Sequence, residues 1–132
     1  MLALDYGSAR TGVAVSDPTG TVARPLDVVE AAGTPKGLTR IVELAQREDA
    51  ERIVVGLPLT LRGERGAQAE ETEEFVAALR GATTLPVETF DERFTTRLAA
   101  RRRGGVPGHA SEDAVAAAYL LTGYLTRTAG RP

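Results

Sequence analysis

The stretch "LALDYGSARTGVAVS", residues 2–16, decides the fold because it holds two apolar runs separated by a glycine-bearing turn. The run before Gly7 predicts a strand, and "TGVAVS" at 11–16 predicts a second strand that returns beside it as a hairpin. Asp5 is unusual here, because an unpaired carboxylate in a buried strand is costly or gives up its charge. Either Asp5 bonds the amides of "GSARTG", or it has a partner such as a proton or a cation.

The chain beyond this hairpin alternates between strand and helix signals. Turn residues at 17–20 lead to a third strand at 21–30, where Pro25 favours a sheet edge or a bulge. A helix capped by Thr34 begins at Pro35, and a buried strand follows at 53–58. The next elements are a helix at about 65–80 that stops at Gly81, a strand at 85–90 and a short helix at 94–103. After a loop at 106–109, a final helix starts near Ser111, its predicted N-cap.

This order of elements predicts a single α/β domain over residues 1–132. We expect a five-stranded mixed sheet, made of a three-strand antiparallel meander plus two parallel strands, with helices on both faces. The final helix is apolar on nearly every side, which indicates that it packs against the sheet.

The composition argues against cysteine chemistry and against a secreted or membrane protein. The net charge is −2 and there is no cysteine, which excludes disulfides, thiolate metal sites and cysteine nucleophiles. Because the sequence has neither a signal-peptide pattern nor an apolar run of membrane length, we expect a cytoplasmic protein with no membrane partner. Acids crowd into residues 70–75, whereas arginines gather in 91–105, where they form either a solvated helix face or a stripe that follows a phosphate backbone.

Acidic residues stand at element ends that this topology brings toward one edge of the sheet: Asp5, the pair Asp91 and Glu92, and Asp113. Each position after Asp5 has a structural alternative, because "DER" suits a surface turn and Asp113 suits the first turn of a helix. Strand alternation allows only one of Asp91 and Glu92 to face Asp5. Converging carboxylates without histidine or cysteine ligands form a hard oxygen site, which suits two Mg²⁺ or Mn²⁺ ions acting on a phosphodiester.

Two other features carry weaker chemical signals. His109 is the single histidine and is either an exposed loop residue or, close to Asp113, a proton shuttle or an aid to product release. The stretch "DYGSARTG" also fits the phosphate-cradling turn of sugar-kinase and actin-like ATPases. The chain has length for one lobe of such an ATPase and lacks the P-loop pattern.

Four blocks of sequence resemble the YqgF/RuvX family of ribonuclease H-like nucleases in order and spacing. The blocks are "LALDYGSARTGVAVSDPTGTVARPL" (2–26), "IVVGLPLTLRGERG" (53–66), "FDERFTT" (90–96) and "SEDAVAAAYLL" (111–121). The resemblance implies a ribonuclease H-like fold and a metal-dependent endonuclease. Its implied reaction is maturation of the 5′ end of pre-16S ribosomal RNA or resolution of Holliday junctions.

The resemblance also implies roles for individual residues. Catalysis and metal binding would fall to Asp5, Glu92 and Asp113, with Asp91 as the alternative second ligand and Glu112 as the alternative third. Nucleic-acid contacts would fall to Arg93 and Arg97. The implied cofactor is Mg²⁺ or Mn²⁺, as two ions.

The chain departs from the family pattern just before its last acidic ligand. The 101–112 segment is short and glycine-rich, and Ser111 and Glu112 stand where members commonly have a lysine. The expected partners are pre-16S rRNA or branched DNA, with ribosomal precursor particles, bound by a monomer or a homodimer. A nucleic-acid or ribosome-assembly binding module with little activity is the alternative to an enzyme.

Overall fold

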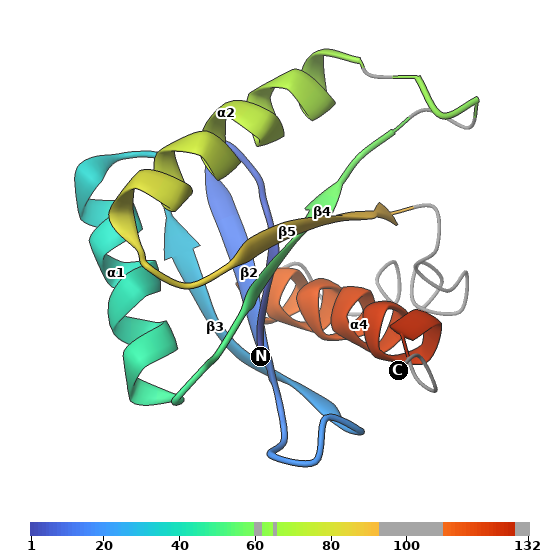
Figure 1. Cartoon of the computed structure of the whole chain (residues 1–132). Helices are drawn as coiled ribbons and strands as arrows, with labels where there is room; N and C mark the ends of the chain where they lie inside the picture. Colours follow the sequence, from blue (N-terminus) through green and yellow to red (C-terminus); the bar gives the residue numbers. More distant parts are fainter. Residues whose placement is uncertain (60–61, 65, 93–109, 129–132) are drawn as a thin grey trace.

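The five strands form one mixed sheet in the computed structural model, which describes residues 1–59, 62–64, 66–92 and 110–128. The strands are β1 (Leu2–Asp5), β2 (Arg10–Ser16), β3 (Ala23–Glu30), β4 (Ile53–Leu57) and β5 (Val87–Asp91). Their order across the sheet is β3-β2-β1-β4-β5 (Figure 1). The β1–β2 and β2–β3 pairs are antiparallel, and the β1–β4 and β4–β5 pairs are parallel. The predicted meander with two added parallel strands is confirmed.

Helices cover both faces of this sheet, as the sequence predicts. The helices α1 (Pro35–Arg47) and α2 (Ala67–Ala82) pack on one face, and α4 (Ala110–Thr128) packs on the other (Figure 1). Because side chains alternate along a strand, Leu2 and Leu4 of β1 join the core with α1 and α2, while Ala3 joins the core with α4. We call these two faces the α1/α2 face and the α4 face.

Local signals in the first half of the chain act as predicted. Thr34 caps α1 by accepting a hydrogen bond from the Gly37 amide at 3.2 Å, and Pro35 is the first helical residue. Strand β3 lies at the edge of the sheet, where its pairing with β2 shifts register near Pro25. That residue therefore sits where a missing amide hydrogen is tolerated.

One predicted helix end and one predicted N-cap were wrong. Helix α2 runs through Gly81 to Ala82, because Gly81 is not in the left-handed conformation by which glycine ends a helix. The described part of helix α4 starts at Ala110, close to the predicted start, but Ser111 lies inside the first turn and is not the N-cap. The first turn of α4 instead carries acidic side chains, which the positive end of the helix dipole favours.

A third boundary moves because of a side chain in the preceding turn. The carboxylate of Asp17 accepts hydrogen bonds from the amides of Thr21 and Val22, at 2.9 and 3.0 Å. These amides are held in the turn, and β3 starts at Ala23 instead of residue 21. The predicted helix at 94–103 and the loop at 106–109 lie outside the described residues.

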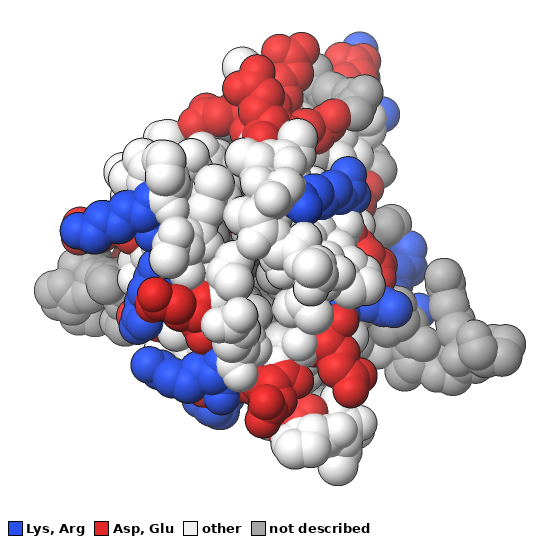
Figure 2. Space-filling model, turned by 60° about the vertical axis from the view of Figure 1, so that its left-hand side comes forward, with Lys and Arg blue, Asp and Glu red and all other residues white. Residues whose placement is uncertain are grey.

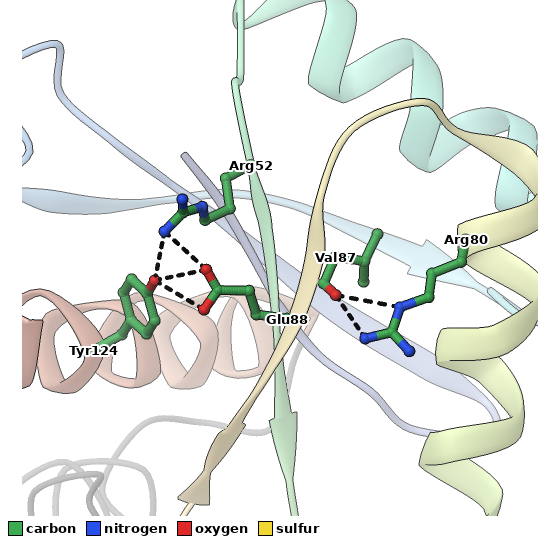
Figure 3. A network of polar contacts seen from close by, with 5 residues as sticks. All are labelled: Arg52, Arg80, Val87, Glu88 and Tyr124. Atoms are coloured by element: carbon green, nitrogen blue, oxygen red, sulfur yellow. Dashed lines mark hydrogen bonds and ion pairs between the residues drawn. The ribbon is translucent and has the colours of Figure 1, made fainter.

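A closed polar network ties the later turns of α4 to the sheet (Figure 3). The Tyr124 hydroxyl donates to the Glu88 carboxylate at 3.0 Å and accepts a hydrogen bond from Arg52 at 3.0 Å. Arg52 also pairs with Glu88 at 2.7 Å, and the Tyr124 ring packs edge-on against Phe90. The network joins α4, β5 and the residue before β4.

Charge is unevenly spread over the described surface. Figure 2 shows acidic side chains gathered along the upper rim of the molecule, the part that α2 occupies in Figure 1. This helix carries the run at residues 70–74, in which four of the five positions are glutamate. None of the helices in the described ranges is both long and apolar enough to cross a membrane.

Candidate active site

Asp5 lies at the end of the middle strand, flanked by a glycine on each neighbouring strand. Gly12 of β2 pairs directly with Asp5. On the other side Leu4 pairs with Val55, which brings Gly56 of β4 alongside Asp5 at the next step. Asp5 is two residues from Ala3, so it shares the α4 face, and the two glycines share that face by the same alternation.

Gly12 lets α4 begin directly on the sheet. A Cβ atom at this position would lie 1.8 Å from the carbonyl oxygen of Asp113, a distance that two atoms cannot adopt. Only glycine therefore allows this close approach of strand and helix. As a result, Asp113 is held one strand away from Asp5.

Gly56 makes the corresponding space for Glu92. A Cβ atom there would lie 2.7 Å from Glu92 Oε1 and 2.9 Å from Leu120 Cδ2 of α4. Glu92 therefore lies on the α4 face, the face that Asp5 occupies, and alternation along β5 turns Asp91 the other way. Of the two acids that the sequence left open, Glu92 is the one that faces Asp5.

Asp5 and Glu92 line one pocket of about 290 Å³ at this edge of the sheet. Its lining is Asp5, Tyr6, Gly7, Ser8, Pro58, Gln68, Glu71, Thr72 and Glu92. The pocket is thus closed on one side by the first turns of α2, and it joins residues that are far apart in the sequence. Asp113 is not part of the lining.

Tyr6 and Glu71 are site residues that the sequence analysis missed. The Tyr6 hydroxyl donates a hydrogen bond to Glu71 Oε1 at 3.3 Å, and the Tyr6 ring stacks on Phe75 with the ring centres 4.5 Å apart. Partial burial, followed by the nearby charges of Glu71 and Glu74, raises the pKa of the Tyr6 hydroxyl above its ordinary value. The acidic run at 70–75 was the available signal, but nothing in its spacing pointed toward Tyr6.

Asp113 is turned toward Arg10, a second residue that the sequence analysis did not single out. Asp113 Oδ2 lies 3.2 Å from Arg10 Nε. This oxygen is buried, and no residue in the described part of the chain donates a hydrogen bond to it. Arg10 therefore offsets the charge of Asp113 and leaves the oxygen atom itself unsatisfied.

The donor set fits a hard divalent cation. Carboxylate oxygens are the ligands that Mg²⁺ and Mn²⁺ prefer, and Asp113 Oδ2 is an acceptor for which the described residues provide no hydrogen bond. The two glycines let the backbone of Asp113 and the side chain of Glu92 approach the strand ends on either side of Asp5. As they stand, however, no three acidic or histidine side chains of the described ranges are arranged to hold one metal ion. Asp113, turned toward Arg10, stands apart from the pocket.

Several predicted residues are placed differently or not at all. Glu112, like Asp113, lies half-buried in the first turn of α4. Arg93 and Arg97, predicted to bind nucleic acid, and His109 lie outside the described residues. Their roles stay predictions, as do the catalytic and metal-binding roles assigned to the acids.

Comparisons with known proteins agree with this architecture. The family model described as "RuvX: Holliday junction resolvase" matches residues 1–127. A protein of Chloroflexus aurantiacus named "Putative pre-16S rRNA nuclease" is 43% identical over 100% of this chain and 90% of its own length. A protein of the same name from Desulforudis audaxviator is 39% identical over 99% of this chain and 97% of its own length.

Solved structures give the fold independently. RuvC of T. thermophilus in complex with a Holliday junction substrate aligns with a TM-score of 0.60 at 19% identity, covering 98% of this chain and 97% of that one. A second structure, of Thermus thermophilus RuvC, aligns with a TM-score of 0.57 at 18% identity and covers 96% of both chains. The predicted ribonuclease H-like fold is confirmed.

Proposed function

Because the chain belongs to the RuvX family, we propose that it is a metal-dependent endonuclease that matures the 5′ end of pre-16S ribosomal RNA. The observation that carries the proposal is the arrangement around Asp5, where two glycines admit Glu92 from one side and the start of α4 from the other. Full-length relatives named as pre-16S rRNA nucleases favour RNA as the substrate. Such a substrate implies a cytoplasmic location and an association with ribosomal precursor particles.

The acidic residues of this chain would hold the metal ions beside the reacting phosphate. Asp5 sits on the central strand and Glu92 follows β5, so both carboxylates are held by the sheet. Asp113 joins them by leaving Arg10. Two Mg²⁺ or Mn²⁺ ions bound by these carboxylates would activate a water for attack on phosphorus and neutralise the departing 3′ oxygen, which leaves a 5′ phosphate on the product. Arg93 and Arg97 are proposed to position the nucleic-acid backbone.

The matched pair Glu92→Gln and Asp91→Asn tests this proposal, because the two residues are neighbours that face opposite sides of the sheet. With Mn²⁺ present, the wild type should cut pre-16S RNA, Glu92→Gln should lose about 100-fold or more in rate, and Asp91→Asn should stay close to the wild type. The proposal fails if the wild type cuts no RNA with either metal, or if the two variants cut equally well. Asp5→Asn, prepared in the same way, controls for a contaminating nuclease.

Holliday junction resolution is the second candidate function. The description of the family model and the RuvC complex favour it. A resolvase cuts two strands and therefore needs two active sites, so this function predicts a stable dimer that cuts a four-way DNA junction. If the junction is cut and pre-16S RNA is not, resolution replaces RNA maturation. Metal-independent binding of either substrate without cleavage would instead indicate a binding module.

A further inference from the structure

Arg10 lies at the edge of the candidate active site, in contact with Asp113. It is the first residue of β2 and lies two residues before Gly12, so it belongs to the α4 face. Its Nε atom lies 3.2 Å from Asp113 Oδ2, and its side chain is 52% exposed. Arg10 is therefore a cation that touches a proposed metal ligand from the solvent side.

The contact between Arg10 and Asp113 is a weak one. The carboxylate oxygen that it reaches is buried and receives no hydrogen bond from the residues that the structure describes. An arginine–carboxylate pair at its best makes two parallel hydrogen bonds. A pair that is half exposed and lacks this geometry contributes little to stability and is readily exchanged for another partner.

Space for an exchange exists directly beside the pair. Arg10 borders a hollow of about 540 Å³ that lies between β3 and the second turn of α4. Its lining includes Leu26, Val28 and the acidic residues Asp27 and Glu30 of β3, and Ala114 and Val115 of α4. The guanidinium can therefore leave Asp113 without displacing the packed core.

We propose that Arg10 is a positioning residue that changes partner when the site fills. In the metal-free protein its guanidinium neutralises Asp113; when a divalent ion takes Asp113, Arg10 is released to contact a phosphate of the nucleic acid. The inference rests on the proposed function. No covalent step is involved, because one cation replaces another at the Asp113 carboxylate and the released arginine pairs with a new anion.

Metal affinity tests the first half of this exchange without any cleavage. Titration of Mn²⁺ into the full chain by calorimetry, with no nucleic acid present, compares wild type, Arg10→Gln and Arg10→Lys. Because Arg10 competes with the ion, Arg10→Gln should bind Mn²⁺ about two- to fivefold more tightly. Arg10→Lys keeps the positive charge and should stay close to the wild type. Equal or weaker Mn²⁺ binding by Arg10→Gln, relative to the wild type, overturns the proposal.

Affinity for RNA tests the second half, and the effect should have the opposite sign. With Mn²⁺ present, Arg10→Gln should raise the KM for pre-16S RNA about tenfold, because one phosphate contact is lost. In EDTA the same substitution should cost clearly less affinity for this RNA, because Asp113 then competes with the phosphate for Arg10. Unchanged KM, or an equal loss of affinity with and without metal, overturns the exchange.

Arg24→Gln is the matched control, because Arg24 is an exposed arginine paired with Glu48 at 2.8 Å and contacts neither Asp5 nor Asp113. It should change neither Mn²⁺ affinity nor KM. If the wild type cuts no RNA, equilibrium binding of the RNA in Mn²⁺ replaces KM. Failure of the proposed function is then distinguished from failure of the exchange.

Discussion

An arginine and an acidic residue lie together at each end of α4, and the two pairs differ in how many hydrogen bonds the carboxylate accepts. Near the later turns, Glu88 accepts from the Tyr124 hydroxyl and pairs with Arg52 at 2.7 Å (Figure 3). In the first turn, Asp113 Oδ2 is buried beside Arg10 and receives no hydrogen bond from any described residue. The polar groups of the later turns are thus satisfied within the protein, whereas the first turn holds a carboxylate oxygen that a ligand could still bind.

This difference indicates that the two ends of α4 have different roles, one in stability and one in function. A buried acceptor without a hydrogen bond costs about 1–3 kcal/mol, so folding alone would not retain it. The closed network around Tyr124 has no such cost and fits a structural role. We therefore expect substitutions in the network to change stability, and substitutions in the first turn to change metal binding and activity.

The largest loss of stability is expected where the sheet touches the first turn. Gly12→Ala places a methyl group only 1.8 Å from the Asp113 carbonyl oxygen, so α4 must move. We expect a loss of about 3 kcal/mol in the free energy of unfolding, measured by urea denaturation.

The control is Gly81→Ala, because a Cβ atom at this helical glycine meets nothing within 4 Å. It should gain about 0.5–1 kcal/mol from helix propensity. Similar stabilities for the two alanine variants would contradict the close packing of α4 on Gly12.

The Tyr124 network should show the next largest effect on stability. Tyr124→Phe removes the hydroxyl that joins Arg52 to Glu88 and leaves the rest of the ring in place. We expect a loss of about 1–2 kcal/mol in thermal or urea unfolding. The rate of RNA cleavage, measured below the melting range, should match the wild type. A loss of cleavage without a loss of stability would reverse the roles assigned to the two ends of α4.

Asp113→Asn should have a small effect on stability and a large one on activity. The variant removes a poorly satisfied charge, so the free energy of unfolding in EDTA should change by less than about 1 kcal/mol. Cleavage and Mn²⁺ affinity should fall sharply in the same preparation. Should the metal-free protein instead lose several kcal/mol, Asp113 is a structural residue like Glu88.

The smallest expected effect is a pH dependence at the edge of the sheet where Arg52 lies. Asp17 and Arg52 line the same hollow, and hydrogen bonds from Thr19 and from the Val22 amide lower the pKa of Asp17 from 3.8 to about 2. Because this pKa is depressed in the folded state, its stabilisation is present above about pH 4 and is lost as the pH falls through 2.

Replacing Asp17 by asparagine should therefore flatten the stability profile between pH 4 and pH 2 and leave the profile at neutral pH parallel to that of the wild type. Unfolding by urea at a series of pH values measures both regions. If the Asp17→Asn variant loses stability between pH 4 and pH 2 as the wild type does, Asp17 titrates at its ordinary pKa in the folded protein.

The sequence predicts those features that depend on short-range signals. The two apolar runs of residues 2–16 predict the β1–β2 hairpin, and the Thr34–Pro35 pair marks the start of α1, because both patterns involve neighbouring residues. Arg10 and Glu71 were missed because their places depend on packing between distant segments. The hydrogen bond from Tyr6 to Glu71, for example, spans 65 positions.

The end of α2 was predicted wrongly for a related reason. Gly81 ends a helix only if its backbone turns left-handed, and the identity of a residue does not fix that conformation. The order of the acids along the chain was enough to predict that they approach one edge of the sheet. It was not enough to predict that Asp113 would turn toward Arg10, because that depends on how α4 lies over Gly12.

The number of Mn²⁺ ions that the full chain binds tests the proposed metal site most directly, with electron paramagnetic resonance following free Mn²⁺ in a titration. We predict two bound ions for the wild type, the same number for the distant control Glu48→Gln, and a clear loss of binding for Asp5→Asn. Mn²⁺ binding by Asp5→Asn that equals the wild type would contradict the claim that the acids around Asp5 form a metal site.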